Sequence, residues 1–135
     1  MITFSLPIYY TIERKTKPST TSLVGDNWLR NLHHHTKNTV KQYYHNLIKD
    51  LVSSIPSTPY QTFSLSMVLY YKNPATDPSN VFHAIEKFTL DGLQDIKVIQ
   101  NDSVNHHIST ITSIGGQDKL NPRCEITVIS KDINE

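Results

Sequence analysis

The sequence contains one cysteine, few glycines and no long apolar segment. A single cysteine, Cys124, excludes an internal disulfide. No stretch approaches the roughly 20 apolar residues of a membrane helix, and residues 1–8 lack the basic start and apolar run of an export signal. With four glycines and seven prolines, the composition also excludes a collagen-like repeat. These absences predict a soluble, cytoplasmic protein with no membrane partner.

The remaining composition is that of one globular domain with an uneven charge. A chain of 135 residues suits a single domain, which we place at residues 1–135. The formal net charge is +1, but residues 1–50 hold seven Lys and Arg against three Asp and Glu. A basic first third is able to meet nucleic-acid phosphates, although an ordinary solvated surface explains the charge equally well.

Two helices are predicted. Apolar residues recur at three- and four-residue steps from about Thr36 to Val52, and the segment 53–56, which ends in proline, stops the pattern. Asp77 followed by Pro78 predicts the start of the second helix, because aspartate caps free N–H groups and proline suits the first helical position. This helix extends to about Leu93.

Strands are predicted on both sides of the two helices. Alternating or β-branched residues predict strands at 2–10, 63–71, 98–99, 107–114 and 124–130. Polar and small residues predict a loop at 15–27 and a turn at 115–118. The order of elements indicates an α+β fold in which two helices pack on a mixed β-sheet.

The candidate chemistry lies around the second helix. Asp77 at its start and Asp102 in a later loop are able to converge on one Mg²⁺ ion, which prefers carboxylate oxygens and serves in phosphodiester cleavage. Ser79, His83, Lys87 and Asp91 recur every four residues and form one polar stripe. The alternative is structural: a helix cap, a solvated ion pair and a turn residue. On these residues alone, the structural interpretation is the stronger.

Several short motifs, taken in order, resemble the RusA family of Holliday-junction resolvases. The motifs are Asn27 with Arg30, Lys37 and Lys41, then Asp77-Pro78-Ser79-Asn80, Lys87, Asp91-Gly92-Leu93, Asn101-Asp102-Ser103 and the closing segment 121–128. No single motif is specific, but their order and spacing together are moderately so. The resemblance extends through nearly the whole chain.

The resemblance implies a RusA-like fold and a Mg²⁺-dependent endonuclease, with Mn²⁺ as a possible substitute. Such an enzyme cuts four-way junctions or other branched DNA as a homodimer, during recombination and repair in a bacterium or its prophage. The implied metal ligands are Asp77, Ser79 and Asp102, and either Lys87 or His83 assists the transition state. The implied DNA-binding residues are Asn27, Trp28, Arg30, Lys37, Lys41 and Asn80.

Ser79 is the main departure from the family, which has a second aspartate at this position. Loss of one anionic ligand costs ~2 kcal/mol of Mg²⁺ binding, roughly a thirty-fold weaker affinity. A second hypothesis is therefore a branched-DNA-binding homologue whose activity is weakened or lost. A third is an interaction module that keeps only the fold.

The histidine and tryptophan residues have further interpretations. Consecutive side chains on a helix point about 100° apart, and no Cys or carboxylate is spaced to complete a transition-metal site with His33, His34 and His35, so we expect phosphate or solvent contact there. His106-His107 predicts a structural role. Trp28 either stacks on an unpaired base or packs in the core or a dimer interface.

Overall fold

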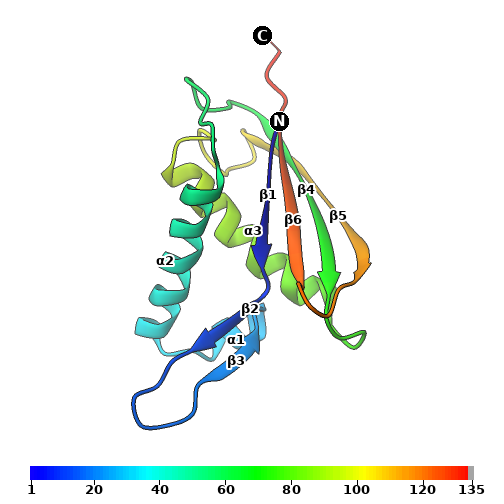
Figure 1. Ribbon diagram of the computed structural model, residues 1–135. Coiled ribbons are helices and arrows are strands. Elements are labelled where there is room, and N and C mark those ends of the chain that lie inside the picture. The colour runs from blue at the N-terminus through cyan, green and yellow to red at the C-terminus, as the bar shows by residue number, and fades with distance from the viewer. Residues whose placement is uncertain (134–135) are drawn as a thin grey trace.

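The computed structural model describes residues 1–133 and has the expected α+β architecture (Figure 1). The helices are α1 (Asp26–Arg30), α2 (His34–Leu51) and α3 (Pro78–Asp95). The strands are β1 (Ile2–Pro7), β2 (Tyr9–Ile12), β3 (Thr20–Leu23), β4 (Phe63–Tyr71), β5 (His107–Gln117) and β6 (Arg123–Ser130). No helix in the described part of the chain is long and apolar enough to cross a membrane.

The main sheet has the strand order β1-β6-β4-β5. β1 and β4 both pair antiparallel with β6, whereas β4 and β5 are parallel. A parallel pair requires a long crossover connection, and α3 supplies it. As a result, α3 begins at the end of the sheet where β4 ends, and it finishes near the start of β5.

α2 and α3 pack side by side on one face of this sheet (Figure 1). Tyr44 of α2 stacks on Phe88 of α3 with 4.7 Å between ring centroids, and the Tyr44 hydroxyl donates to the carbonyl of Pro7 at 2.7 Å. Gly92 lets the helices approach, because a Cβ there would lie 2.7 Å from Cδ1 of Ile48. The core between helices and sheet is fully apolar along β4, where Phe63, Leu65, Met67 and Leu69 are buried.

The structure corrects the sequence prediction in the first thirty residues. The segment expected as one strand bends after Pro7 and leaves the main sheet, and its second part, β2, pairs with β3 in a small two-stranded ribbon. β3 lies within the stretch 15–27 that was predicted as a loop, and α1 begins in it. The hydroxyls of Thr11 on β2 and Thr21 on β3 form a hydrogen bond of 2.7 Å across the ribbon. These two strands lack the alternation of apolar and polar residues by which a strand is predicted from sequence.

Two further boundaries differ from the prediction. Val98 and Ile99 are buried but form only an isolated bridge, between Ile99 and Tyr60, rather than a strand. β5 continues through Gly115 and Gly116 to Gln117, so the turn begins at Asp118. Gly115 fits inside the strand because the Tyr70 ring covers it: an added Cβ would lie 2.5 Å from Cζ of that ring.

β5 forms one edge of the sheet and is exposed on both faces. Ile111 is 66% exposed, and the strand carries no Lys, Arg, Asp, Glu or Pro. The opposite edge, β1, is a shorter strand of six residues. Within the described residues, the sheet face away from α2 and α3 carries no helix (Figure 1).

Candidate functional site: a basic groove between three helices

The Asn80 side chain links the short helix α1 to the start of α3. The Asn27 backbone N–H donates to Oδ1 of Asn80 at 3.1 Å. Gly25, the N-cap of α1, makes this contact possible, because an added Cβ would lie 2.2 Å from Nδ2 of Asn80. Two residues that the family resemblance implicates in DNA binding are therefore in direct contact, although 53 positions separate them.

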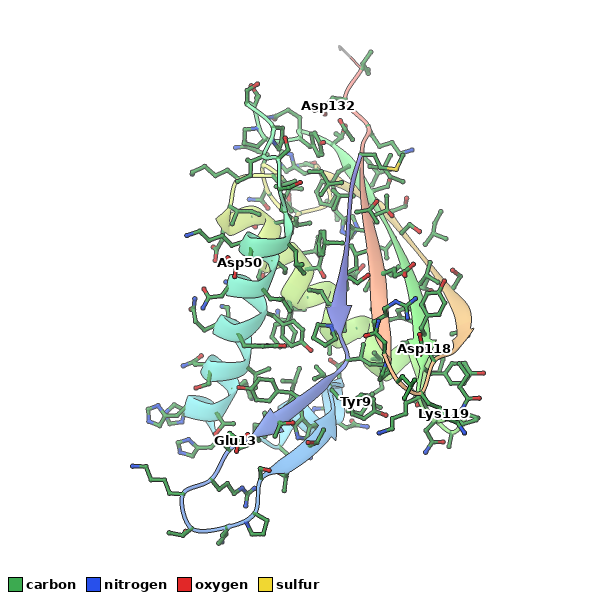
Figure 2. The ribbon with its side chains drawn as sticks, viewed as in Figure 1. Tyr9, Glu13, Asp50, Asp118, Lys119 and Asp132 are labelled. Atoms are coloured by element: carbon green, nitrogen blue, oxygen red, sulfur yellow. The ribbon has the colours of Figure 1, made fainter. Side chains whose placement is uncertain are left out.

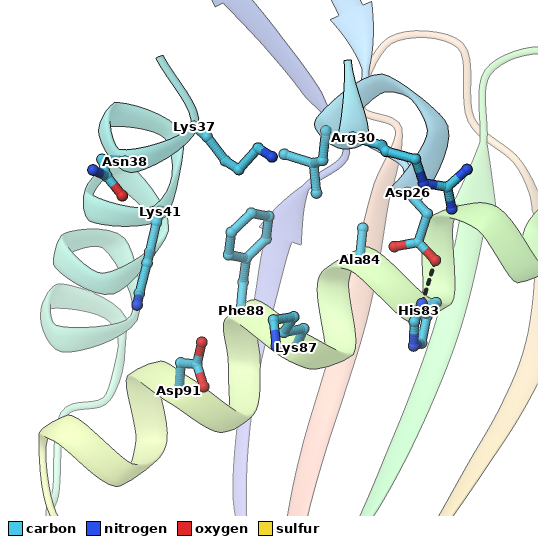
Figure 3. Close-up of a pocket in the computed structure, with 11 residues that line it drawn as sticks. Asp26, Arg30, Lys37, Asn38, Lys41, His83, Ala84, Lys87, Phe88 and Asp91 are labelled. Atoms are coloured by element: carbon cyan, nitrogen blue, oxygen red, sulfur yellow. Dashed lines mark hydrogen bonds and ion pairs between the residues drawn. The ribbon is translucent and has the colours of Figure 1, made fainter. Parts of the chain in front are cut away.

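A groove of about 440 Å³ lies where the three helices meet (Figure 3). We call it the three-helix groove. Its lining comprises Asp26, Leu29 and Arg30 of α1, Lys37, Asn38 and Lys41 of α2, and His83, Ala84, Lys87, Phe88 and Asp91 of α3. Three of the predicted DNA-binding residues, Arg30, Lys37 and Lys41, thus share one surface with His83 and Lys87.

The three-helix groove concentrates the positive charge of the chain. It collects four Lys and Arg side chains but only two carboxylates, whereas the whole chain has a net charge of only +1. Lys37 and Lys41 lie four residues apart on α2 and both reach toward α3 (Figure 3). The four basic side chains are exposed, and Leu29, Ala84 and Phe88 form the apolar part of the lining.

Asp26 contacts Nδ1 of His83 and fixes the position of this imidazole at the rim of the groove (Figure 3). The contact is an ion pair when the imidazole is protonated. Arg30 is oriented by a neighbour as well, since its Nη1 donates to Oδ1 of Asn27 at 3.2 Å. Sequence reasoning missed Asp26, because no pattern relates it to a histidine 57 positions away.

A smaller hollow of about 230 Å³ continues along the exposed side of α3. We call it the Asp102 hollow. It is lined by His83, Glu86, Lys87, Leu90, Asp91 and Asp102. Three residues of the predicted polar stripe, His83, Lys87 and Asp91, line both this hollow and the three-helix groove, so the two surfaces are continuous. The predicted assisting residues therefore lie next to one predicted metal ligand.

The other two predicted ligands, Asp77 and Ser79, lie at the start of α3. Asp77 is the N-cap, and its Oδ1 accepts a hydrogen bond from the Ser79 N–H at 3.1 Å. The Asp102 hollow begins at His83, six residues or ~9 Å further along the helix axis, and neither Asp77 nor Ser79 lines it. The predicted ligands therefore fall in two places within one chain.

These positions decide how the residues fit a magnesium ion. The donor atoms are of the right kind, because Mg²⁺ prefers oxygen ligands at 2.0–2.1 Å in octahedral geometry. Asp77 and Ser79 offer such oxygens at the start of α3, and Asp102 offers its carboxylate beside His83 and Lys87, further along the same helix.

Comparison of the sequence with models of known protein families gives no match, and comparison with curated proteins gives none either.

The remaining predicted residues have mixed positions. Trp28 is half-buried and lies 6.2 Å from the Tyr10 ring between centroids, so it packs against the core rather than standing free. Cys124 is fully buried, and burial raises the pKa of its thiol to about 12. This thiol is therefore unsuited to act as a nucleophile.

The geometric expectation for His33, His34 and His35 is wrong. Their rings do not point apart but lie 4.1 to 5.0 Å from one another between centroids at the start of α2; the His33 ring stacks with the other two, and the rings of His34 and His35 are tilted. Within residues 1–133, they form the one group of three or more His, Cys, Asp or Glu side chains whose ligand atoms all lie within 4.8 Å of one another. His33 is the N-cap and lies outside the helix, so helical spacing does not govern its position relative to the other two.

Proposed function

We propose that this chain binds and cuts branched DNA as a Mg²⁺-dependent, RusA-like endonuclease. The observation that supports this most is the three-helix groove, where Arg30, Lys37, Lys41 and Lys87 from three helices line one surface. Neutralising backbone phosphates provides most of the affinity for nucleic acids. The order of motifs along the chain supports the choice of branched DNA and hydrolysis over simple binding.

In this proposal the DNA backbone lies along the three-helix groove and passes the Asp102 hollow. Lys87 and His83 line both surfaces, so they are placed to donate hydrogen bonds to the non-bridging oxygens of the phosphate that is cut. Asp26 holds the His83 ring toward the groove. During hydrolysis a water oxygen gives up a proton and bonds to phosphorus, the bond from phosphorus to one ester oxygen breaks, and that leaving oxygen takes up a proton. A bound Mg²⁺ would supply charge neutralisation at the phosphate.

A second copy of the chain would complete the ligand set. β5 is an unprotected edge strand of eleven residues without charge or proline, and such edges pair readily with another chain. Antiparallel pairing of two β5 strands about a two-fold axis near Thr112 would set the start of one β5 beside the end of the other. Asp102 precedes β5 and Asp77 follows the adjacent β4, so the partner's Asp102 would approach Asp77.

The proposed activity is tested with a synthetic four-way junction, Mg²⁺ and the Asp77→Asn variant. Asparagine is as good an N-cap as aspartate, so α3 keeps its start while an anionic ligand is lost. We expect nicking to fall by ~100-fold or more, because removal of a direct metal ligand costs at least as much as the 10–100-fold loss seen for outer residues of metal sites. Asp50→Asn, an exposed carboxylate at the end of α2, is the matched control.

Two results would contradict the proposal. Nicking that persists in Asp77→Asn removes the assigned role of this residue, and equal cutting of linear and four-way DNA removes the preference for branched substrates. Absence of any nicking, together with tight junction binding, would favour the alternative of a binding protein.

The alternative of a catalytically weakened branched-DNA-binding homologue rests on Ser79. This residue offers a hydroxyl where the family has a carboxylate, and its N–H already occupies one oxygen of Asp77. Under this alternative, Ser79→Asp restores some cutting in a protein that otherwise only binds. If Ser79→Asp also leaves the junction intact, the missing carboxylate is not the cause of inactivity.

A further inference from the structure

Three histidine rings gather at the start of α2, where Glu13, which follows β2, lines one hollow with His35. The rings of His33 and His34 stack at 4.3 Å, and those of His34 and His35 lie 4.1 Å apart. All three side chains are exposed, and one nitrogen of each lies within 4.8 Å of the other two. This cluster is separate from the three-helix groove, because none of the three histidines lines that groove.

The local backbone explains why the rings converge. His33 has φ −58° and ψ 145°, which is not helical, and its ring folds back over the first turn, where Nδ1 accepts the His35 N–H at 3.2 Å. Only His34 and His35 follow the helical spacing. The N-cap geometry therefore brings a third imidazole to the two that the helix presents.

A carboxylate lies within reach of the same place. Glu13 and His35 line one hollow of about 360 Å³, together with Tyr10, Thr11, Ile12, Thr36 and Thr39. Glu13 follows the end of β2 and lies close to the start of α2 (Figure 2). The cluster thus offers three imidazole nitrogens, and the Glu13 carboxylate lies beside it as a fourth donor from a separate part of the chain.

We propose that His33, His34 and His35, with Glu13 at the fourth position, bind a divalent transition-metal ion of the Zn²⁺, Ni²⁺ or Cu²⁺ class. Imidazole nitrogen suits these ions, whereas Mg²⁺ prefers oxygen donors. Zinc takes four ligands in tetrahedral geometry, with Zn–N distances of 2.0–2.1 Å. Exposed side chains need only rotate to bring nitrogens that are within 4.8 Å to that geometry.

Two local effects oppose cation binding and define the role of each residue. The N-terminus of a helix carries partial positive charge, and the Glu13 carboxylate offsets it. Nδ1 of His33 is engaged as a cap, so coordination by this ring through either nitrogen competes with the cap hydrogen bond. The side chains of His34 and His35 do not cap the helix, so their substitution removes a proposed ligand and leaves the N-cap hydrogen bond of His33 in place.

A metal ion at this place would join the β2–β3 ribbon to α2. The two elements would then be cross-linked in the folded state only, and a ligand that binds the folded state alone raises the melting temperature. Stability therefore provides a readout independent of DNA cutting, so that failure of the nuclease proposal and failure of this one are distinguishable.

The site is tested by calorimetric titration of the intact chain with Zn²⁺. We expect one ion per chain, and His34→Ala or His35→Ala to weaken binding by at least ~tenfold, since loss of a direct ligand exceeds the 10–100-fold cost of losing an outer residue. Glu13→Gln should weaken it less. His106→Gln is the matched control, because this half-buried histidine bonds the Gln61 carbonyl at 2.7 Å and lies outside the cluster.

His33→Asn separates the two roles of the cap residue. Asparagine is a strong N-cap, so α2 keeps its start while an imidazole is removed. We expect Zn²⁺ to raise the melting temperature of the wild type by several degrees and to have little effect on His33→Asn or His34→Ala. Zinc affinity that is unchanged in His34→Ala and His35→Ala, or equally reduced in His106→Gln, would overturn the proposal.

Discussion

At the scale of single residues, the chain places polar groups where they serve a structural and a chemical purpose together. Asp77 caps α3 and is also the first proposed metal ligand. Asn80 holds α1 and is also a predicted DNA contact. Because each side chain has a structural partner in the fold, substitutions must preserve that partner if they are to report on chemistry alone.

Asp132 illustrates a carboxylate with a purely structural role. It accepts hydrogen bonds from the Thr62 N–H at 2.8 Å, the Gln61 N–H at 3.1 Å and the Thr62 hydroxyl at 3.1 Å. These donors, the Thr62 N–H above all, hold the pKa of Asp132 below its ordinary value of 3.8. The charged form is therefore favoured in the folded state.

We predict that Asp132→Asn lowers the free energy of unfolding by about 1 kcal/mol at pH 7. A carboxylate whose pKa is depressed by folding stabilises the protein above its unfolded pKa, and this contribution is lost as pH falls through the folded pKa. The difference between variant and wild type should therefore shrink below about pH 4. Urea unfolding at pH 7 and pH 3 measures it, and Asp50→Asn is the control. A difference that is constant with pH contradicts the assignment.

At the scale of elements, the strongly patterned segments were predictable from the sequence and the weakly patterned ones were not. The strand at 63–71 and the helix that starts at Pro78 were predicted at those positions because alternation and a proline-marked cap are local signals. β3 was not, because the polar segment Thr20–Leu23 is held by pairing with β2 and not by burial of its own side chains.

The same distinction applies to the candidate site. The polar stripe of α3 follows from helical spacing alone, and His83 and Lys87 are exposed along it. The convergence of α1, α2 and α3 does not follow from spacing, because it depends on long-range packing such as the contact between Asn27 and Asn80. Sequence therefore identified members of the groove but not Asp26, and it could not show that Asp102 lines one hollow with His83 and Lys87.

α2 supplies two of the four cations of the three-helix groove, which leads to a prediction about salt dependence. If Lys37 and Lys41 contact phosphates, their replacement by glutamine should make the slope of log affinity against log salt shallower by ~0.9 per lost contact, about 1.8 in all. Fluorescence anisotropy with a labelled four-way junction at several salt concentrations measures the slope.

Lys49 offers a matched control on the same helix. It is exposed near the end of α2 and lines none of the described grooves. Lys49→Gln should leave the slope nearly unchanged. An equal change for Lys49→Gln and for each groove lysine would mean that the general charge of the protein, and not the groove, attracts DNA.

At the scale of the whole molecule, the unpaired edge strand β5 is the feature that bears most directly on assembly. β5 is an exposed strand of eleven residues. Its Ile111 side chain is exposed and is the register partner of Ser66 on β4. Pairing of two such edges would extend the four-stranded sheet of each copy into one of eight strands. It would also cover apolar side chains that are exposed in the single chain.

We predict that the wild type is a dimer in solution and that Ile111→Lys is a monomer, because an edge lysine opposes strand pairing. Sedimentation equilibrium or size-exclusion chromatography with light scattering measures the mass, and circular dichroism checks the fold. Nicking should be lost with the dimer. Ser5→Lys places the same charge on the exposed side of the other edge strand, β1, and should leave the dimer intact. A monomeric wild type at micromolar concentration contradicts the prediction.

The position of β6 has a consequence for how the chain is made. Among the described strands, β6 is the last to be synthesised, yet it lies between β1 and β4 in the finished sheet. Until it arrives, β1 has no neighbour in the main sheet and β4 has one free side. Nascent chains therefore carry unpaired apolar strands throughout synthesis, a condition that invites aggregation and recruits chaperones. Expression should accordingly be sensitive to temperature and to any truncation that reaches residue 123.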